Sequence, residues 1–302
     1  MKMKKLGFGG LFVILGGLLW YLFIKPFDYT IRFEANAIPG TINQTLKLWD
    51  QTLDTVHGIK QGDNLNHLTQ EVRFGDSIHS YHWKIKPLTD STSKVIVNVR
   101  DRNNSLTNKI QVPFKETDFV QRSKKTVFDF METLDSHTKK IKVTLLGKEE
   151  IPSKYVAYLP VKVTQFQKAR GMMENFSYLT NELYVNGVEL DGPPILEITK
   201  WDMENDSIYY NFGQPIIRSE RLPIGTDIQY KRIFSKKALK AEYNGNYITS
   251  DRAWYALLDY AKKNGIEVTP KPIEIFYDNP NLGSGELNWK AEIYMPIKEA
   301  DE

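Results

Sequence analysis

Pro272-Ile-Glu-Ile-Phe-Tyr-Asp-Asn-Pro280 and Trp289-Lys-Ala-Glu-Ile-Tyr-Met-Pro-Ile297 are the two stretches that decide the fold of the carboxyl-terminal half. Side chains alternate in character along Ile273–Tyr277 and along Trp289–Ile297, so each stretch predicts a β-strand with two chemically distinct faces. On the second strand one face carries Trp289, Ala291, Ile293 and Met295, and the other carries Lys290, Glu292 and Tyr294. A helix packed on the apolar face would leave the mixed face for a ligand.

The residues before these strands predict that helix. Thr249 or Ser250 can cap its first turn, and an apolar stripe then recurs at helical spacing in Ala253, Trp254, Leu257, Leu258 and Ala261. Gly265 is expected to end the helix, because glycine readily takes the left-handed conformation found just after a helix. The tyrosine-rich Lys240-Ala-Glu-Tyr-Asn-Gly-Asn-Tyr247 leads into it as a turn.

An internal repeat predicts the architecture of residues 142–302. Residues 143–163 indicate a strand and turn, 165–179 a helix, and 195–201 and 208–216 two strands. Residues 228–297 repeat this order, and Gln214-Pro215-Ile216 ends the first copy as Met295-Pro296-Ile297 ends the second. The two copies are expected to pair about a pseudo-twofold axis, with helices outside and a central cleft between the uncovered sheet faces.

The order of a tyrosine-rich turn, a helix, a strand ending in Tyr-Asp-Asn-Pro and a closing strand ending in Pro-Ile resembles the gyrase-inhibitor-like (GyrI-like) family. The resemblance covers residues 142–298, and the same effector-binding domain ends many transcription activators of the AraC and MerR types. In that family a glutamate on the penultimate strand lies at the floor of an aromatic pocket and meets cationic ligands. The resemblance implies this role for Glu274.

The resemblance and the strand alternation together give a set of candidate ligand-binding residues. Phe276 alternates with Glu274, so both are expected on the face away from the helix, which Glu292 and Tyr294 share. The full set is Glu274, Phe276, Glu292, Tyr294, Tyr243, Tyr247 and Tyr209. Tyrosine supplies a pocket with stacking area and a hydroxyl, and a desolvated carboxylate among aromatic rings favours a cation.

Composition and motifs argue against several other kinds of site. The chain has no cysteine, which removes disulfides, thiolate nucleophiles and cysteine-ligated metals. No Gly-x-Ser-x-Gly, His-Glu-x-x-His or phosphate-loop motif occurs, and all five histidines precede residue 138, away from the candidate pocket. No metal and no cofactor are therefore expected. The 40 basic and 37 acidic residues give a net charge of +3, which is too balanced to indicate a nucleic-acid partner.

The amino terminus predicts a membrane anchor. Residues 6–24 carry no charge, and as a helix they would span about 28 Å at ~1.5 Å per residue, close to the thickness of a bilayer core. The end of this stretch offers no small-x-small cleavage site, which favours an uncleaved signal anchor over a cleaved signal peptide. Lys2, Lys4 and Lys5 precede the span and Lys25 follows it. This asymmetry predicts a single-pass protein with a cytoplasmic amino terminus and residues 28–302 on the outer side, periplasmic or extracellular.

The middle of the chain is expected to form a separate domain. Residues 28–35 alternate as a strand, 42–53 have helical spacing, strand-like runs follow between 68 and 114, and 117–140 predict a long helix. This order resembles the helix-grip fold of the START-related, polyketide-cyclase-like (SRPBCC) family, which encloses an apolar cavity between its sheet and its long helix. The chain is thus predicted to be α+β, with an anchor at 1–27, a helix-grip-like domain at 28–141 and a duplicated β-α-β-β effector-binding domain at 142–302.

The sequence leaves three functions open. The favoured function is that of a membrane-anchored protein with an aromatic cleft and a central glutamate. This cleft would bind a small amphipathic molecule, and if that molecule is charged, a cation is expected. Some members of the GyrI-like family are hydrolases of strained electrophilic compounds, so the second function is an enzyme. Glu274 would be its general base, and Tyr243, Tyr247 or Tyr294 would be the donor of a hydrogen bond or proton. The third is a cell-surface scaffold whose cleft binds a protein segment. Direct control of transcription is rejected, because an apolar span and a long non-basic segment occupy the place of the family's usual DNA-binding helices.

Overall fold

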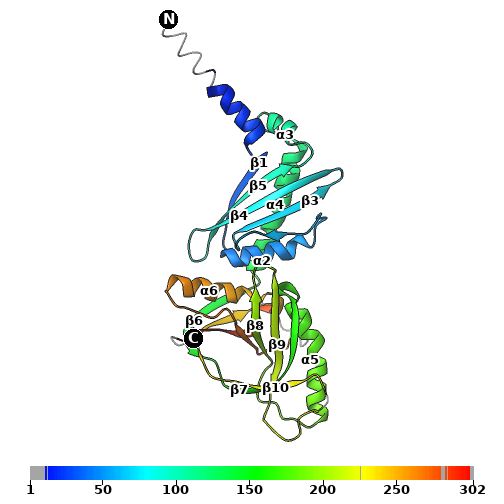
Figure 1. Ribbon diagram of the computed structural model, residues 1–302, viewed down its shortest axis with the longest axis vertical. Coiled ribbons are helices and arrows are strands. Elements are labelled where there is room, and N and C mark those ends of the chain that lie inside the picture. Colours follow the sequence, from blue (N-terminus) through cyan, green and yellow to red (C-terminus); the bar gives the residue numbers. More distant parts are fainter. Residues whose placement is uncertain (1–10, 12, 225, 280–282, 284, 300–302) are drawn as a thin grey trace. The chain divides into compact units, whose positions relative to one another are not determined.

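The computed structural model describes residues 11, 13–224, 226–279, 283 and 285–299. The chain divides into two compact units, Met1–Asp135 and Ser136–Glu302 (Figure 1). Each unit has its own antiparallel β-sheet with helices packed on it. The fold therefore mixes α-helices and β-strands, as the sequence predicts.

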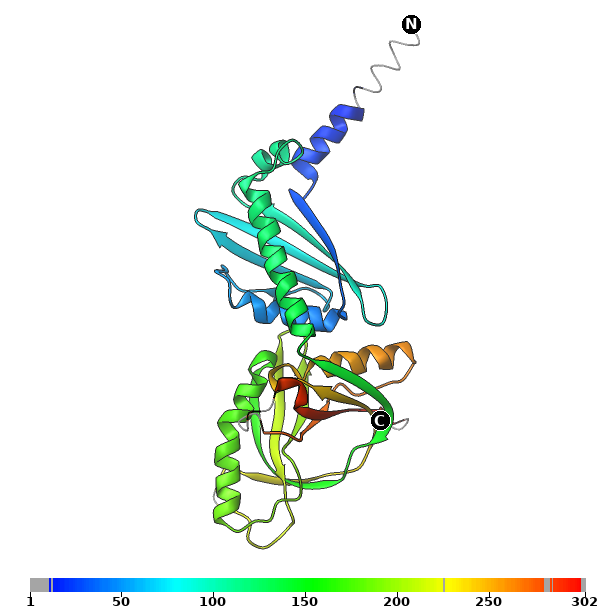
Figure 2. The same ribbon diagram turned by 180° about the vertical axis from the view of Figure 1, so that it is seen from behind.

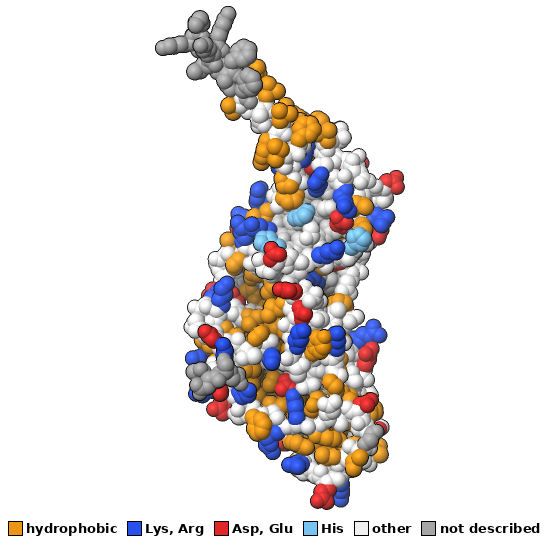
Figure 3. All heavy atoms as spheres, viewed as in Figure 1, with side chains coloured by type: hydrophobic (Ala, Val, Ile, Leu, Met, Phe, Trp, Pro, Cys, Tyr) orange, Lys and Arg blue, Asp and Glu red, His pale blue; other side chains and the backbone are white. Residues whose placement is uncertain are grey.

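The first described helix of the first unit is apolar. Residues 13–19 are α-helical and continue into a π-helical turn, η1 (Trp20–Ile24). Hydrophobic side chains cover the face of this helix that Figure 3 shows, and Val13 and Ile14 are exposed at 76% and 70%. Within the residues described above, no helix combines the length and the apolar character needed to cross a bilayer. The predicted anchor at residues 6–24 begins outside those residues, so it stays a prediction.

The sheet of the first unit has five strands in the order β1-β5-β4-β3-β2. Along the chain the elements are β1 (Tyr29–Ala35), α2 (Pro39–Asp50), β2 (Lys60–Gln61), β3 (His67–Phe74), β4 (Ser77–Pro87), β5 (Ser93–Asp101), α3 (Ser105–Gln111) and α4 (Asp118–Thr138). The long helix α4 lies across one face of the sheet (Figure 2). This is the order of strand, short helix, meander and long helix that the sequence indicates.

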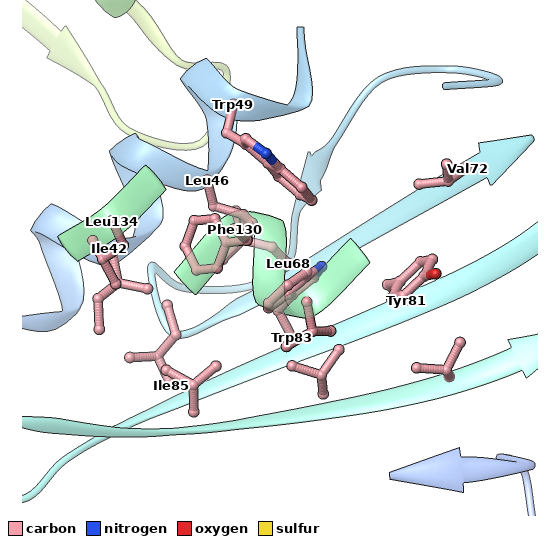
Figure 4. Packing of buried hydrophobic residues seen from close by; sticks show 14 of the residues in the cluster. Ile42, Leu46, Trp49, Leu68, Val72, Tyr81, Trp83, Ile85, Phe130 and Leu134 are labelled. Carbon is pink, nitrogen blue, oxygen red and sulfur yellow. The ribbon is translucent and has the colours of Figure 1, made fainter. Parts of the chain in front are cut away.

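Aromatic rings fill the space between this sheet and α4 (Figure 4). The ring of Phe130 on α4 packs against Trp49 and Trp83, with centroids 5.3 and 5.1 Å away. The three side chains are at most 6% exposed. The helix-grip resemblance implies an apolar cavity between the sheet and the long helix. In this structure the rings of Trp49, Trp83 and Phe130 pack against one another there. Kinship with the START-related family stays a prediction.

The second unit has one sheet of eight strands in the order β10-β7-β9-β8-β12-β13-β11-β6. Along the chain its main elements are β6 (Lys142–Glu150), β7 (Lys154–Thr164), α5 (Lys168–Val185), β8 (Ile195–Asp202), β9 (Ser207–Pro215), β10 (Gln229–Ile233), β11 (Lys237–Asn244), α6 (Arg252–Lys263), β12 (Ile273–Phe276) and β13 (Lys290–Pro296). Short 3-10 turns, η2 (Gln165–Gln167) and η3 (Tyr247–Thr249), lead into α5 and α6.

The order of elements in the second unit agrees with the predicted repeat. The first copy is β7-α5-β8-β9, the second is β11-α6-β12-β13, and the copies meet where β8 pairs with β12. The apolar stripe of α6 is buried at Ala253, Trp254, Leu257 and Ala261. Gly265 follows the helix with a φ of +63°, the conformation expected for a glycine that ends it.

The two faces of this sheet differ from the prediction at β12. We call the face that carries α5 and α6 the helix face and the opposite one the open face. In the antiparallel ladder Glu274 pairs with Ile293, and Ile275 pairs with Glu292. Paired residues point to the same side of a sheet, and Ile293 lies on the helix face. The prediction that Glu274 and Phe276 face away from the helix is therefore wrong.

A second apolar cluster explains this error. The prediction assumed that Ile273 and Ile275 must turn toward the helix to be buried. They are instead buried on the open face, 5% and 6% exposed. The cluster around them contains Ile151, Val156, Ile195, Ile233, Ala238 and Tyr294. Because both faces of the sheet bury apolar side chains, alternation alone could not decide which way the glutamate points.

Candidate functional site

Glu274 lies at the centre of a buried polar group on the helix face. Its carboxylate accepts hydrogen bonds from Lys168 Nζ at 2.9 and 2.7 Å, from Ser250 Oγ at 3.1 Å, and from Trp254 Nε1 at 2.6 Å. The side chains of Lys168 and Glu274 are both 0% exposed. The starts of α5 and α6 supply these donors, so the group ties both helices to the middle of the sheet.

The environment of Glu274 suits a structural ion pair better than a reactive group. Burial raises the pKa of its carboxyl above the ordinary value, and the Lys168 ammonium and the Trp254 indole partly offset that rise. The Lys168 ammonium also lies 4.9 Å from the centroid of the Trp254 ring. A general base must reach the proton that it removes. In this sealed position Glu274 has no contact with solvent, so the structure gives no support to the predicted hydrolase.

The other candidates on this side are core residues. The Tyr247 and Phe276 rings pack at 4.8 Å, and the Tyr247 hydroxyl donates to the Lys290 carbonyl oxygen at 2.7 Å. The Tyr243 hydroxyl bonds the Asn246 carbonyl oxygen at 2.8 Å, and its side chain is fully buried. Burial raises the pKa of Tyr247 to about 12. The roles of these residues toward a ligand stay predictions, and in this conformation their side chains fill the core.

Glu292 and Tyr294 lie together on the open face, as the sequence predicts. One oxygen of Glu292 accepts hydrogen bonds from the hydroxyls of Tyr277 and Tyr294 at 2.9 and 2.8 Å. The other lies 3.3 Å from the amines of both Lys240 and Lys290. Burial acts against the charged form of Glu292, but these partners outweigh it and lower the pKa. Burial and the nearby Glu292 carboxylate raise the pKa of Tyr294 to about 12.

Tyr209 is separate from this group. It lies on β9, half-buried, with the amines of Lys162 and Lys200 over its ring at 5.0 and 5.5 Å. The structure thus divides the seven predicted residues. Glu274, Phe276, Tyr243 and Tyr247 belong to the helix face, whereas Glu292, Tyr294 and Tyr209 belong to the open face.

A second glutamate on the open face was missed by the sequence analysis. Glu197 on β8 pairs with Ile273 in the sheet, so it points to the side opposite Glu274. Its carboxylate accepts a hydrogen bond from Asn211 Nδ2 at 2.9 Å and one from Lys231. The Lys231 amine also lies 5.0 Å from the centroid of the Tyr158 ring. The sequence signal for Glu197 was its position two residues after Ile195 on a predicted strand. In the pairing of β8 with β12, Glu197 lies opposite Ile273 and Leu196 lies opposite Glu274, so the two glutamates point to opposite faces.

Glu197 also lines a pocket of about 360 Å³. The other lining residues are Ile151, Ile198, Thr199, Arg232, Ile233, Phe234, Lys236, Thr269, Lys271, Ile273, Pro296, Ile297 and Glu299. Seven of the fourteen lining residues are apolar, and the other seven are charged or polar. Small-molecule sites commonly have volumes of this order.

The first unit has a more polar pocket, of about 420 Å³. His79, Asp101 and Arg122 are among its lining residues. Burial lowers the pKa of His79 to about 4, so the imidazole is neutral near pH 7. Across the described part of both units, no group of three or more histidine, aspartate or glutamate residues is arranged to hold a metal ion.

The GyrI-like small molecule binding domain is the family whose model matches this chain, over residues 148–298. No curated protein matches the chain. Among solved structures, the EcmrR C-terminal domain is 17% identical with a TM-score of 0.43, over 53% of this chain and 99% of that one. SAV2435 bound to tetraphenylphosphonium is 11% identical with a TM-score of 0.35, over 51% and 94%. A hydrolase from Listeria innocua is 12% identical with a TM-score of 0.33, over 54% and 98%.

Proposed function

The chain belongs to the GyrI-like small molecule binding domain family through residues 148–298, and on that basis we propose that it binds a small amphipathic molecule on the open face of its second unit. The pocket beside Glu197 is the observation that carries this proposal. Its volume of about 360 Å³ suits one small molecule. Ile151, Ile233 and Ile273 would contact the apolar body, and the charged rim would meet a polar group.

The helix face is a poorer location for this ligand. Glu274 and Lys168 satisfy each other there, and both side chains are 0% exposed. A ligand could reach them only by displacing the starts of α5 and α6. On the open face Glu197 and Lys231 are 24% and 28% exposed, so a ligand can approach without a rearrangement of the fold.

We also propose that residues 6–24 hold the protein at a membrane, with residues 28–302 on the outer side. The support is the uncharged run itself and the apolar side chains that residues 13–24 leave exposed. The full-length protein should then remain with the membrane fraction after carbonate extraction and keep its original amino terminus. A mature protein that begins after residue 20 would contradict this proposal.

Ligand binding is tested with a variant whose larger side chain fills part of the pocket. Thr269 lines it and is half-buried, so Thr269→Trp should occupy part of its volume. The fluorescent dye 8-anilinonaphthalene-1-sulfonate should bind this variant about tenfold more weakly than the wild type. Thr180→Trp on α5 is the matched control and should leave the affinity unchanged. Dye that binds to the exposed apolar helix contributes equally to the signals of the wild type and the two variants, so it does not affect their comparison. Equal affinities for Thr269→Trp and the wild type would refute the open-face pocket.

A further inference from the structure

Lys231 makes, beside the pocket residue Glu197, the two kinds of contact that a ligand cation would make. Its amine donates to the Glu197 carboxylate and lies 5.0 Å from the centroid of the Tyr158 ring. A carboxylate and an aromatic face are the two groups that attract an organic cation in a partly desolvated site. The position of such a cation is therefore already filled by a side chain of the protein.

The backbone holds Lys231 in this place. Strand β10 pairs with β7 through the register Lys231 to Val156, so the lysine stands directly beside the strand that carries Tyr158. The Tyr158 hydroxyl donates to Gln229 Oε1 at 2.9 Å, which fixes the ring to the same strand. A group attached to the fold competes with a free ligand at a high effective concentration. A soluble cation would therefore have to displace an amine that is covalently attached to the fold.

The same arrangement recurs at the second carboxylate of the open face. Lys240 and Lys290 both approach Glu292 at 3.3 Å. Lys240 lies 5.2 Å from the centroid of the Tyr294 ring, and Lys290 lies 5.1 Å from that of Tyr277. At both carboxylates a lysine amine thus meets both the acid and a tyrosine ring. The lysines neutralise the acidic groups that would otherwise favour a cation.

The remaining charges of the pocket are mainly positive. With Glu197 neutralised by Lys231, the lining retains Arg232, Lys236 and Lys271 against the single carboxylate of Glu299. All four of these side chains belong to exposed residues, so they can move to meet a bound group. Such a rim attracts an anionic group and repels a cationic one.

We propose that Lys231 is a tethered cation that fills the cation position of the open-face site, so that the site selects anionic amphipathic molecules and rejects lipophilic cations. This inference rests on the proposed function and names the chemical class of its ligand. It replaces the cationic ligand that the sequence favoured. Lys231 is then the residue that determines specificity, and loss of its amine exposes the Glu197 carboxylate and the Tyr158 ring to a cation.

The test compares two ions of nearly the same shape and opposite charge, tetraphenylborate and tetraphenylphosphonium, by equilibrium dialysis with the full-length protein. The wild type should bind tetraphenylborate more tightly. In Lys231→Met the apolar part of the side chain remains and the amine is lost. Tetraphenylphosphonium affinity should rise about tenfold, and tetraphenylborate affinity should fall. Lys162→Met removes an amine from over the Tyr209 ring, and neither residue is among those that line the pocket, so both affinities should stay nearly unchanged.

Two further variants make the result decisive. Lys231→Gln is neutral but polar, and it should show the same reversal, so it replaces the Met variant if that protein fails to fold. The double variant Lys231→Met/Glu197→Gln should lose the affinity for tetraphenylphosphonium that the single variant gained. An unchanged order of the two ions in the Lys231 variants, with tetraphenylborate still bound, overturns the role of Lys231 and leaves the proposed function intact. If no protein binds either ion, both proposals fall.

Discussion

Breaking the buried ion pair between Lys168 and Glu274 should destabilise the second unit strongly. Each side chain is 0% exposed, and the two approach at 2.7 Å. Removing one partner leaves the other buried without compensation, which costs about 3–5 kcal/mol in the free energy of unfolding. Lys168→Met and Glu274→Gln should each show a loss of this size at pH 7.

The double variant Lys168→Met/Glu274→Gln should be more stable than either single variant. Neither charge remains, and the glutamine oxygen can still accept from Ser250 and Trp254, which donate to Glu274 in the wild type. We expect a total loss of about 1–2 kcal/mol, because the hydrogen bonds of the Lys168 amine are lost while those donated by Ser250 and Trp254 survive. The difference between this value and the sum of the single losses measures the coupling of the two residues.

The pH dependence of Lys168→Met provides an independent readout. Burial already raises the Glu274 pKa above 4.5, and loss of the ammonium removes the main opposing effect. The folded variant therefore holds a proton that the unfolded chain releases above about pH 4.5, so its stability should decrease as the pH rises from that value. The stability deficit relative to the wild type should be smaller at pH 4 than at pH 7.

Guanidinium unfolding at 25 °C, followed by circular dichroism and tryptophan fluorescence, measures these energies. Arg170→Met is the matched control, because Arg170 forms an exposed pair with Glu174 on the same helix, and solvent screens such a pair, so its loss should change the free energy of unfolding little. Additive losses, with the double variant as unstable as the two single losses combined, would refute the reasoning. So would a Glu274→Gln protein as stable as the wild type.

Two other predictions concern single residues. The His79 pKa is about 4 in the folded protein and 6.5 in the unfolded chain. The neutral imidazole therefore contributes about 3 kcal/mol of stability at most, and this contribution should be lost as the pH falls from 6.5 toward 4. A first-unit melting temperature that falls just as steeply with pH in His79→Gln would contradict this. Gly171→Ala should destabilise α5 packing by about 1–3 kcal/mol, because the added methyl would lie 2.4 Å from Tyr210 Oη and 3.2 Å from Val161 Cγ1. Ser177→Ala, on an exposed part of α5, is the control for thermal unfolding, and equal melting temperatures for the two variants would contradict the close contact.

The repeat and the element order could be read from the sequence because they depend on local patterns. The alternation of β13, the apolar stripe of α6 and the glycine after it each agree with the structure. Pro-Ile at the ends of both copies marked corresponding strands, Gln214–Ile216 and Met295–Ile297. These signals require no knowledge of distant residues.

The site could be predicted only in part, because the direction of β12 depends on residues far away in the chain. Both faces of the sheet bury apolar side chains, so the alternation of Ile273 and Ile275 fits either orientation. The partner of Glu274 on the helix face is Lys168, 106 residues earlier. The importance of Glu197 depends in the same way on Lys231, which comes from a different strand. Local alternation correctly placed Glu292 with Tyr294, since both lie on one strand.

Amide hydrogen exchange with bound 8-anilinonaphthalene-1-sulfonate tests the central claim most directly, because it reports where on the second unit a small molecule binds. An open-face ligand should slow exchange in β10 (Gln229–Ile233) and in the adjoining residues 234–236 and 269–273. The segment 247–255, which borders the buried Glu274 group, should exchange at the rate of the free protein. Slower exchange confined to 247–255 and the start of α5, with β10 unchanged, would contradict the account and return the ligand to the helix face.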